Sequence, residues 1–350
     1  MNESVFSLID KLAQNHSLTE EEYQHLIAER TPDAAEYLAA LARAAKERVY
    51  GNAVFVRGLI ELSSFCKNDC LYCGIRRSNT SCSRYRLTPE TILNCCAEGY
   101  TLGFRTFVLQ GGEDNAFTDE MLCSILSEIK RRFPDCAVTL SLGERGFDSF
   151  LRLYDAGADR YLLRHETADE QHYELLHPKE MSFANRMQCL RDLKAIGYQT
   201  GCGFMVGSPF QTTETLAKDL KFIETFAPEM CGIGPFLPHH ATPFANQEKG
   251  SAELTCYLLS VVRLIHPNIL LPATTALSSL SAQGRIQGIL AGANVIMPNL
   301  SPQSVRADYS LYDGKQYTES ESAQEIAQLK VEIQSVGGEI VTDRGDIKFF

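Results

Sequence analysis

The sequence lacks the features that would place it in a membrane, a secretory pathway or a nucleic-acid complex. None of its 350 residues lies in a run of about 18 uninterrupted apolar residues, the length that a membrane span needs. The first residues, Met1-Asn-Glu-Ser-Val5, have neither the basic nor the apolar region of a signal peptide, so we expect a cytoplasmic protein. A net charge of −11 leaves no surplus of positive charge for binding phosphate backbones. We therefore expect no membrane partner and no nucleic-acid partner.

The 12 cysteines do not form a disulfide framework, because the chain is long and carries no secretion signal. Five of them lie in apolar runs, where a reduced thiol packs as a small hydrophobic group. These five are Cys123, Cys189, Cys202, Cys231 and Cys256.

Three other cysteines are clustered, and a fourth is missing from the cluster. Cys66, Cys70 and Cys73 have the spacing C-x3-C-x2-C directly after an apolar run. Thiolates are the usual ligands of iron–sulfur clusters, and three of them leave one iron of a cubane open. An open coordination position is typical of a metal site that performs chemistry, whereas structural sites are closed by four protein ligands. We therefore expect this loop to be an active site.

The pattern along the chain predicts an α/β fold, a complete (β/α)8 TIM-type barrel over 51–320. Residues 1–50 form an N-terminal helical extension, with Thr19 and Glu22 as a capping box. Residues 321–350 are expected to form the last barrel helix and a C-terminal hairpin. Longer amphipathic segments separate eight short apolar runs, as in repeated βα units. The predicted strands are 53–62, 105–110, 137–142, 160–164, 200–205, 230–234, 268–273 and 293–297. A doubly wound open sheet is the alternative, because short apolar runs do not reveal closure.

Polar residues follow nearly every predicted strand, at the end of a barrel where active sites lie. Gln110 and Glu113 follow the second strand, Arg164 and Glu166 the fourth, and Thr274 the seventh. The structural alternative is that such residues are helix caps, or that Arg164, Glu166 and Arg186 form a buried ion pair. A zinc site completed by His239 or His240 is the alternative for the cysteines.

An open iron can be chelated by the amino and carboxylate groups of S-adenosylmethionine (SAM). One electron then cleaves a carbon–sulfur bond and gives methionine and a 5′-deoxyadenosyl radical. This chemistry needs acceptors for the SAM amine and a donor for its carboxylate. Glu113, Glu166 and Arg186 are suitable in kind, and Tyr72 is suited to pack against the adenine.

The cysteine motif, with an aromatic residue before its last cysteine and Gly-Gly-Glu after the next strand, resembles the radical SAM superfamily. Within it, further motifs between about residues 35 and 315 are similar to the HydE family of [FeFe]-hydrogenase maturases. These motifs lie at 72–79, 85–90, 108–114, 139–144, 161–167, 232–238, 272–276 and 292–299. The resemblance implies a full barrel that holds one [4Fe-4S] cluster and SAM at its top, with an internal cavity for substrate.

Carried over residue by residue, the resemblance gives three groups of site residues. It implies that the cluster ligands are Cys66, Cys70 and Cys73. It implies that the SAM contacts are Tyr72, Gln110, Glu113, Glu166 and Arg186. It implies that the substrate cavity is lined by Arg57, Arg164, Thr274, Thr275 and Met297, with Tyr309 and Tyr312 near it.

The resemblance also implies a role and partners. The radical would act on a small-molecule or organometallic iron substrate during assembly of the dithiomethylamine-bridged diiron subcluster of the hydrogenase H-cluster. Other hydrogenase maturation proteins and an electron donor would be its partners. Some relatives bind a second cluster near the C-terminus, but no cysteine follows Cys256 here, so we expect that cluster to be absent.

Two other functions remain open at this point. The first is a different small-molecule radical SAM enzyme, similar to methylornithine synthase or biotin synthase, with the same barrel and another cavity. The second is a non-catalytic iron–sulfur carrier or scaffold. Arg57, Arg164 and the Thr274-Thr275 pair favour the maturase, and cleavage of SAM would separate an enzyme from a carrier.

Overall fold

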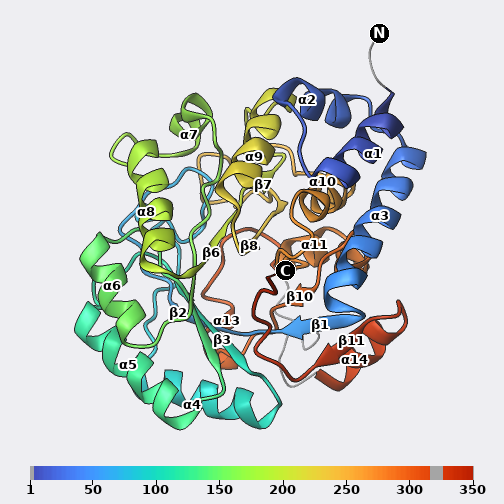
Figure 1. Cartoon of the computed structure of the whole chain (residues 1–350). Helices are drawn as coiled ribbons and strands as arrows, with labels where there is room; N and C mark the ends of the chain where they lie inside the picture. The colour runs from blue at the N-terminus through green and yellow to red at the C-terminus, as the bar shows by residue number, and fades with distance from the viewer. Residues whose placement is uncertain (1–3, 316–325, 350) are drawn as a thin grey trace.

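The computed structural model describes residues 4–315 and 326–349. Its first part is helical, as predicted, and lies along one side of the molecule beside α9 (Thr213–Phe226) and α10 (Ala252–Ile265) (Figure 1). Thr19 accepts a hydrogen bond from the backbone of Glu22, whose side chain bonds back to Thr19, so the predicted capping box is confirmed. The helices of this part are α1 (Val5–Asn15), α2 (Glu20–Ala28) and α3 (Pro32–Tyr50).

The largest sheet has six parallel strands in the order β2-β3-β4-β5-β6-β8. Because this order follows the chain without a reversal, it contradicts the doubly wound alternative, in which the strand order turns back at a switch point. The strands are β2 (Gly58–Ser63), β3 (Thr106–Gly111), β4 (Ala137–Ser141), β5 (Arg160–Leu162), β6 (Gln199–Cys202) and β8 (Met230–Cys231).

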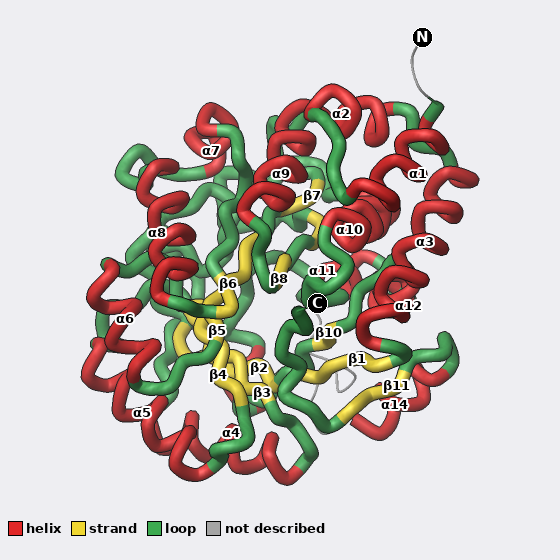
Figure 2. Tube along the Cα trace, in the orientation of Figure 1, coloured by secondary structure: helices red, strands yellow, loops and turns green. Residues whose placement is uncertain are grey.

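Helices connect these strands and cover the outer face of the sheet (Figure 2). Four of them begin at N-cap residues whose hydroxyl groups accept a backbone N–H of the first turn. These caps are Thr88, Thr118, Ser182 and Thr212. The connecting helices, besides α9, are α4 (Pro89–Thr101), α5 (Asp119–Arg132), α6 (Phe147–Asp155), α7 (Glu170–Leu176) and α8 (Phe183–Ile196).

The remaining strands are shorter than the apolar runs that predicted them. The run 53–62 is divided at Arg57 into β1 (Ala53–Val56) and β2. The runs 200–205 and 230–234 each divide in two, giving β7 (Met205–Val206) and β9 (Gly234–Pro235), which pair in parallel. The predicted run 268–273 contributes two isolated parallel bridges, Met230 to Leu270 and Pro272 to Val295. A third bridge joins Leu59 of β2 to Asn299.

The prediction of a C-terminal hairpin is wrong. β11 (Glu339–Val341) is a single strand that pairs in parallel with β1, which also pairs with β10 (Val295–Ile296). The tail after β11 is held by side chains instead of a second strand, since Arg160 Nη2 lies 2.5 Å from Asp346 Oδ1. Of the predicted last helix, α14 covers Ile326–Gln334, and its first predicted residues lie outside the described ranges. The other helices are α11 (Thr275–Leu280), α12 (Gly284–Leu290) and α13 (Gln303–Arg306).

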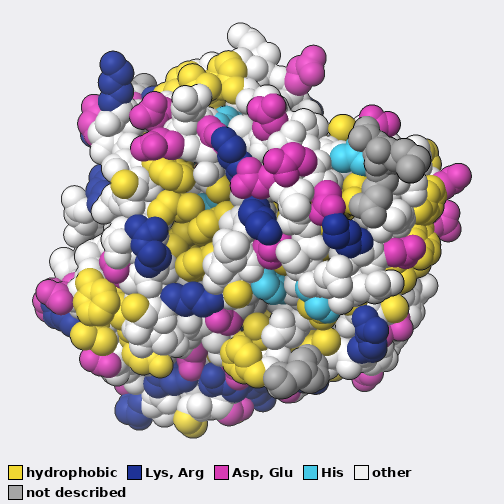
Figure 3. Space-filling model, turned by 45° about the horizontal axis from the view of Figure 1, so that its top comes forward, with side chains coloured by type: hydrophobic (Ala, Val, Ile, Leu, Met, Phe, Trp, Pro, Cys, Tyr) yellow, Lys and Arg dark blue, Asp and Glu magenta, His cyan; other side chains and the backbone are white. Residues whose placement is uncertain are grey.

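The face shown in Figure 3 carries charges of both signs with hydrophobic side chains exposed between them. Lysine and arginine side chains are interspersed with acidic ones on the face shown in Figure 3. No helix within the described ranges combines the length and hydropathy of a membrane span.

Candidate active site

The loop that carries the three cysteines follows β2 and is fastened by Arg84. The guanidinium donates hydrogen bonds to the carbonyl oxygens of Ser64, Ile75 (2.7 Å), Arg76 (2.6 Å) and Asn79 (3.1 Å). These carbonyls stand on both sides of the cysteines. One cation therefore holds together a loop that has no helix or strand of its own.

Two further contacts fix the course of this loop. Asp69 accepts hydrogen bonds from Arg76 Nε (2.7 Å) and from the backbone and hydroxyl of Ser78, which hold the pKa of Asp69 well below its ordinary range. Gly112, after β3, packs directly on the loop. A Cβ at this glycine would lie 2.2 Å from the carbonyl oxygen of Phe65 and 2.8 Å from Cβ of Cys66, so only glycine allows this approach.

The three thiols line one cavity of about 310 Å³ at the C-terminal ends of the strands. Burial raises the pKa of each thiol, and the charge of Cys66 adds to this effect at Cys70 and at Cys73, whose pKa rises to about 12. Three neighbouring thiolates repel one another unless a cation binds them, so this donor set fits a metal that prefers sulfur, such as iron. Among the described residues that line the cavity there is no fourth cysteine and no histidine.

His239 and His240, the donors that a zinc site would need, are engaged elsewhere. His240 Nδ1 lies 2.8 Å from Asp313 Oδ1, and the two imidazole rings are stacked with centroids 4.5 Å apart. Nδ1 of His239 accepts the backbone N–H of Ala241. The pair therefore packs a loop over the site and does not line the cysteine cavity.

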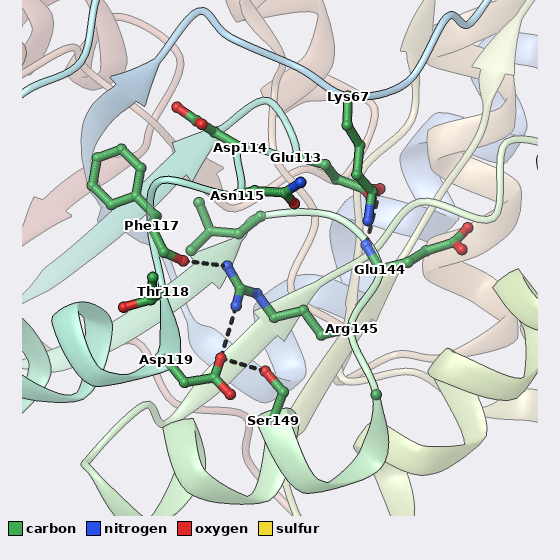
Figure 4. Close-up of a pocket in the computed structure, with 12 residues that line it drawn as sticks. Lys67, Glu113, Asp114, Asn115, Phe117, Thr118, Asp119, Glu144, Arg145 and Ser149 are labelled. Carbon is green, nitrogen blue, oxygen red and sulfur yellow. Dashed lines mark hydrogen bonds and ion pairs between the residues drawn. The ribbon is translucent and has the colours of Figure 1, made fainter.

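Glu113 lines both the cysteine cavity and a second cavity of about 290 Å³, which is shown in Figure 4. Its Oε1 accepts the backbone N–H of Glu144 (3.0 Å), and its Oε2 lies 3.1 Å from Nζ of Lys67. On the far side of the second cavity, Arg145 donates to Asp119 Oδ1 (2.9 Å). The two contacts of Glu113 hold its carboxylate in one orientation.

Glu166 follows β5 in the left-handed backbone region, with φ of 65°. Its Oε2 lies 3.2 Å from Nη2 of Arg164. Arg186 of α8 does not join this pair: its Nε donates to Glu144 Oε1 (2.6 Å) and its Nη1 to the carbonyl oxygen of Arg164 (2.6 Å). The ion pair expected as a structural alternative thus exists for Arg164 and Glu166, whereas Arg186 pairs with Glu144.

Two buried polar atoms of this cavity have no partner in the described part of the chain. They are Nε of Arg164 and Oγ1 of Thr274, whereas Nη2 of Arg164 and Oε2 of Glu166 are paired with each other. Buried polar groups are normally satisfied, and each unpaired one costs about 1–3 kcal/mol. Such atoms at a cavity wall fit a polar ligand that would complete their hydrogen bonds.

Tyr72, inside the cysteine motif, is held by a neutral histidine. Nδ1 of His177 lies 2.9 Å from the carbonyl oxygen of Tyr173 and must donate to it, so Nε2 accepts the hydroxyl of Tyr72 (3.1 Å). Burial, with the charge of Arg186, lowers the pKa of His177 to about 3. The Tyr72 side chain is thereby oriented at the cavity wall.

Most of the predicted site residues meet in this one cavity. They are Cys66, Cys70, Cys73, Tyr72, Gln110, Glu113, Arg164, Glu166, Arg186, Thr274, Tyr309 and Tyr312. Gln110 also donates to the hydroxyl of Tyr309 (3.3 Å), which joins two of these residues directly.

Arg57, Thr275 and Met297 do not line the cavity. Arg57 is buried at the opposite end of the strands, where its Nη1 lies 3.0 Å from Sδ of Met230 at the start of β8. Met297 packs on the apolar cluster that contains Met230. Thr275 is the first residue of α11, directly after Thr274.

Sequence reasoning missed four residues that position this site. Arg84, Asp69 and His177 act through backbone carbonyls or through a neighbouring side chain, and no spacing rule connects them with the cysteines. Glu144 was visible as a charged residue after a predicted strand, but its partner Arg186 lies on a helix 42 residues away. Its position directly after a predicted strand was the signal that could have identified Glu144 as a site residue.

The chain matches the radical SAM superfamily over residues 60–223. It is 44% identical over 280 residues to the [FeFe] hydrogenase maturase subunit HydE of Thermotoga maritima, covering 80% of each chain. It is 29% identical over 308 residues to the 3-methylornithine synthase of Methanosarcina barkeri, covering 88% of this chain and 87% of that relative.

Solved structures share the parallel α/β fold. Methylornithine synthase (PylB) has a TM-score of 0.82 at 26% identity, covering 95% of this chain and 97% of its own. HydG, a maturase of the [FeFe]-hydrogenase, has a TM-score of 0.78 at 18% identity, covering 95% of this chain and 75% of the HydG chain. The three clustered cysteines fall inside the segment that matches the superfamily. The chain therefore belongs to the radical SAM superfamily and, within it, to the family of the [FeFe]-hydrogenase maturase subunit HydE.

Proposed function

We propose that the protein is a radical SAM enzyme that acts in the assembly of the diiron subcluster of the [FeFe]-hydrogenase H-cluster. One observation carries this proposal: three thiols share a single cavity with the Arg164–Glu166 ion pair and with unpartnered polar atoms of Arg164 and Thr274. The thiols suit a cluster, and the unpartnered atoms suit polar ligands beside it. The 44% identity to HydE supports the same reaction class.

Cys66, Cys70 and Cys73 would hold one [4Fe-4S] cluster. When bound, this cluster and SAM supply a 5′-deoxyadenosyl radical through one-electron cleavage of a carbon–sulfur bond. The cavity lies at the C-terminal ends of the strands and is lined in part by Tyr309 and Tyr312, which would help to keep bulk water from the reaction. Since no cysteine follows Cys256, a second cluster near the C-terminus is not part of the proposal.

The polar residues around the thiols would each bind a different group of SAM. Glu113 and Glu166 would accept hydrogen bonds from the amine, because each presents a carboxylate at the cavity wall. Arg186 and Gln110 would donate to the carboxylate and the ribose, and Tyr72 would pack against the adenine. Lys67 and Glu144 hold Glu113 and Arg186 in place before any ligand arrives.

The substrate would bind deeper, in the interior of a complete barrel. Arg164 and Thr274 present unpartnered donors, which suit a carboxylate-bearing ligand such as iron-bound cysteine. Thr275, next to Thr274, is the other threonine that the family resemblance assigns to the substrate. The bridges from Leu270 to Met230 and from Asn299 to Leu59 support closure of the sheet.

Arg57 carries a buried positive charge at the opposite end of the strands from the cavity. Its side chain is buried, its Nε has no hydrogen-bond partner among the described residues, and desolvation lowers its pKa. The proposed substrate is an anionic organometallic iron precursor, delivered by a partner maturase, and Arg57, Met230 and Met297 lie outside the cavity that would receive it. An electron donor is the other partner that the reaction needs.

The test is anaerobic reconstitution with iron and sulfide, then reduction and addition of SAM. We expect 5′-deoxyadenosine to form, and the protein to restore hydrogen production when it replaces the HydE subunit of a hydrogenase maturation system. Cys70→Ala should abolish both the cluster and the cleavage. Cys189→Ala is the matched control, because this thiol is buried on α8 and lines no part of the cavity. Full cluster content without cleavage of SAM would refute the proposal.

A different substrate is the second candidate, favoured by the TM-score of 0.82 to methylornithine synthase. Formation of 3-methylornithine by the reconstituted protein, with no restoration of hydrogenase activity, would establish this alternative.

A further inference from the structure

Glu166 has a backbone conformation that residues with a Cβ rarely adopt, and it is held there from outside the cavity. Its φ of 65° lies in the left-handed region, which costs free energy unless the surroundings enforce it. Its backbone N–H donates to the carbonyl oxygen of Gly203 (3.0 Å), and the residue forms an isolated parallel bridge with Phe204. The neighbouring strand end therefore fixes one side of this turn.

His165 and Asp219 fix the other side. Nδ1 of His165 accepts the backbone N–H of Gly203 (3.2 Å), so the proton of the neutral ring is on Nε2, which lies 3.3 Å from Oδ1 of Asp219. The same oxygen of Asp219 accepts the backbone N–H of Ala168 (2.5 Å). One carboxylate oxygen of α9 thus contacts the residue before Glu166 and the residue two positions after it.

This pair is enclosed and belongs to neither cavity described above. Both side chains have no exposed surface, and the His165 ring lies 4.7 Å from the ring of Phe222, one turn along α9 from Asp219. Burying a carboxylate in apolar surroundings is unfavourable, and burial raises the pKa of Asp219. Apolar contacts alone could tether α9 to the sheet. Here one carboxylate oxygen of Asp219 also contacts the residues on both sides of Glu166.

We propose that Asp219 and His165 are positioning residues that hold Glu166 in its left-handed conformation and so aim its carboxylate at SAM. This inference rests on the proposed function, in which Glu166 binds the SAM amine. Asp219 itself touches no ligand in this arrangement. It acts through the turn from His165 to Ala168.

The first test measures the dissociation constant of SAM for the cluster-loaded protein. Asp219→Ala should weaken SAM binding about tenfold, because the turn relaxes and must be strained again on binding. Asp219→Asn keeps an oxygen at the same place and should restore most of the affinity. Asn294→Ala is the matched control: this buried amide oxygen accepts the backbone N–H of Leu271 (3.0 Å) at the opposite end of the strands. It should lower the Tm and leave the affinity for SAM unchanged.

The decisive test is the double variant with Glu166→Ala. If Asp219 acts through Glu166, Asp219→Ala should cause no further loss of affinity when Glu166 is already alanine. An equal loss in both backgrounds, or no loss in either, would overturn the inference while leaving Glu166 as a ligand. If Glu166→Ala alone binds SAM as the unchanged protein does, the proposed role of Glu166 fails, and the positioning role with it. If Asp219→Ala does not take up the cluster, His165→Asn takes its place in the test. This variant keeps an acceptor near Gly203 and removes only the contact with Asp219. It should also weaken SAM binding, and should cause no further loss when Glu166 is already alanine.

Discussion

Alanine at Gly143 should displace Glu113 and thereby weaken SAM binding. A Cβ at Gly143 would lie 2.0 Å from Cγ and 2.2 Å from Oε1 of Glu113. The backbone of Gly143 cannot easily retreat, because its carbonyl oxygen accepts the hydroxyl of the fully buried Tyr161 (2.8 Å). Glu113 ends in a flexible side chain, so it is the group that moves. Its hydrogen bond from the backbone of Glu144 is then lost.

The effect of Gly143→Ala on stability and its effect on SAM binding have different sources and sizes. Gly143 has φ of 75°, where a residue with a Cβ costs about 1–2 kcal/mol of folding free energy. A hydrogen bond to a charged group contributes about 1.5–3 kcal/mol, so losing the one from Glu113 to the SAM amine should weaken binding about 10- to 150-fold. Gly337 has φ of 77° and nothing within 4 Å of its Cβ position. Gly337→Ala therefore has the same strain without the clash.

The assay compares the two variants for thermal unfolding and for SAM affinity after cluster reconstitution. Both should lose the strain energy of about 1–2 kcal/mol, and Gly143→Ala should lose more because the hydrogen bond from Glu144 to Glu113 is also lost. Both should take up the cluster. Only Gly143→Ala should lose affinity for SAM. If the two variants bind SAM equally well, Glu113 is not a ligand of SAM, and the proposed binding site is wrong on this side.

Three other substitutions test residues that hold the loops and side chains of the site in place. Arg84→Met removes a cation from four carbonyl oxygens and should destabilise the chain by about 3 kcal/mol and lower the iron bound per chain after reconstitution, measured by iron analysis. His177 has a folded pKa of about 3, below the ordinary 6.5, so its stabilisation is complete above pH 6.5 and is lost as the pH falls toward 3. His177→Gln should flatten this slope, at most about 1.4 kcal/mol per pH unit, in unfolding measured at pH 7 and pH 5. Glu61→Gln leaves the ammonium of Lys315 (2.6 Å) without its buried carboxylate and should cost about 3–5 kcal/mol, with faster hydrogen exchange at 309–315.

Local signals predicted the helices well and the strands less well. Thr19 and Glu22, or Thr88 before Pro89, set a helix start through contacts within four residues, which the sequence displays directly. A strand end depends on its neighbour. The apolar run 53–62 reads as one strand, but Arg57 divides it because β1 pairs with β10 and β11 while β2 pairs with β3. Pairing across the chain is absent from the local pattern.

The same distinction applies to the site. The cysteine spacing and the strand-end rule predicted Glu113 and Glu166 in one place, and both line the cavity with the thiols. The rule could not place Arg57, which lies inside an apolar run and not after one, and the structure buries it at the opposite end of the strands. Nor could it find that Arg186 pairs with Glu144, since this contact depends on how α8, packed beside β6, reaches the loop after β4.

The partners of each charged group separate residues that the protein has already oriented from residues that await a ligand. Glu113 and Arg186 are each fixed by two contacts within the chain, so their charges are in position before SAM binds. Arg164 and Thr274 keep buried polar atoms without a partner in the described chain, and only a bound molecule would satisfy them. In the proposed function, the first group therefore positions the cofactor common to the superfamily. The second group selects the substrate, so exchange of Arg164 or Thr274 should alter which molecule reacts while leaving cleavage of SAM intact.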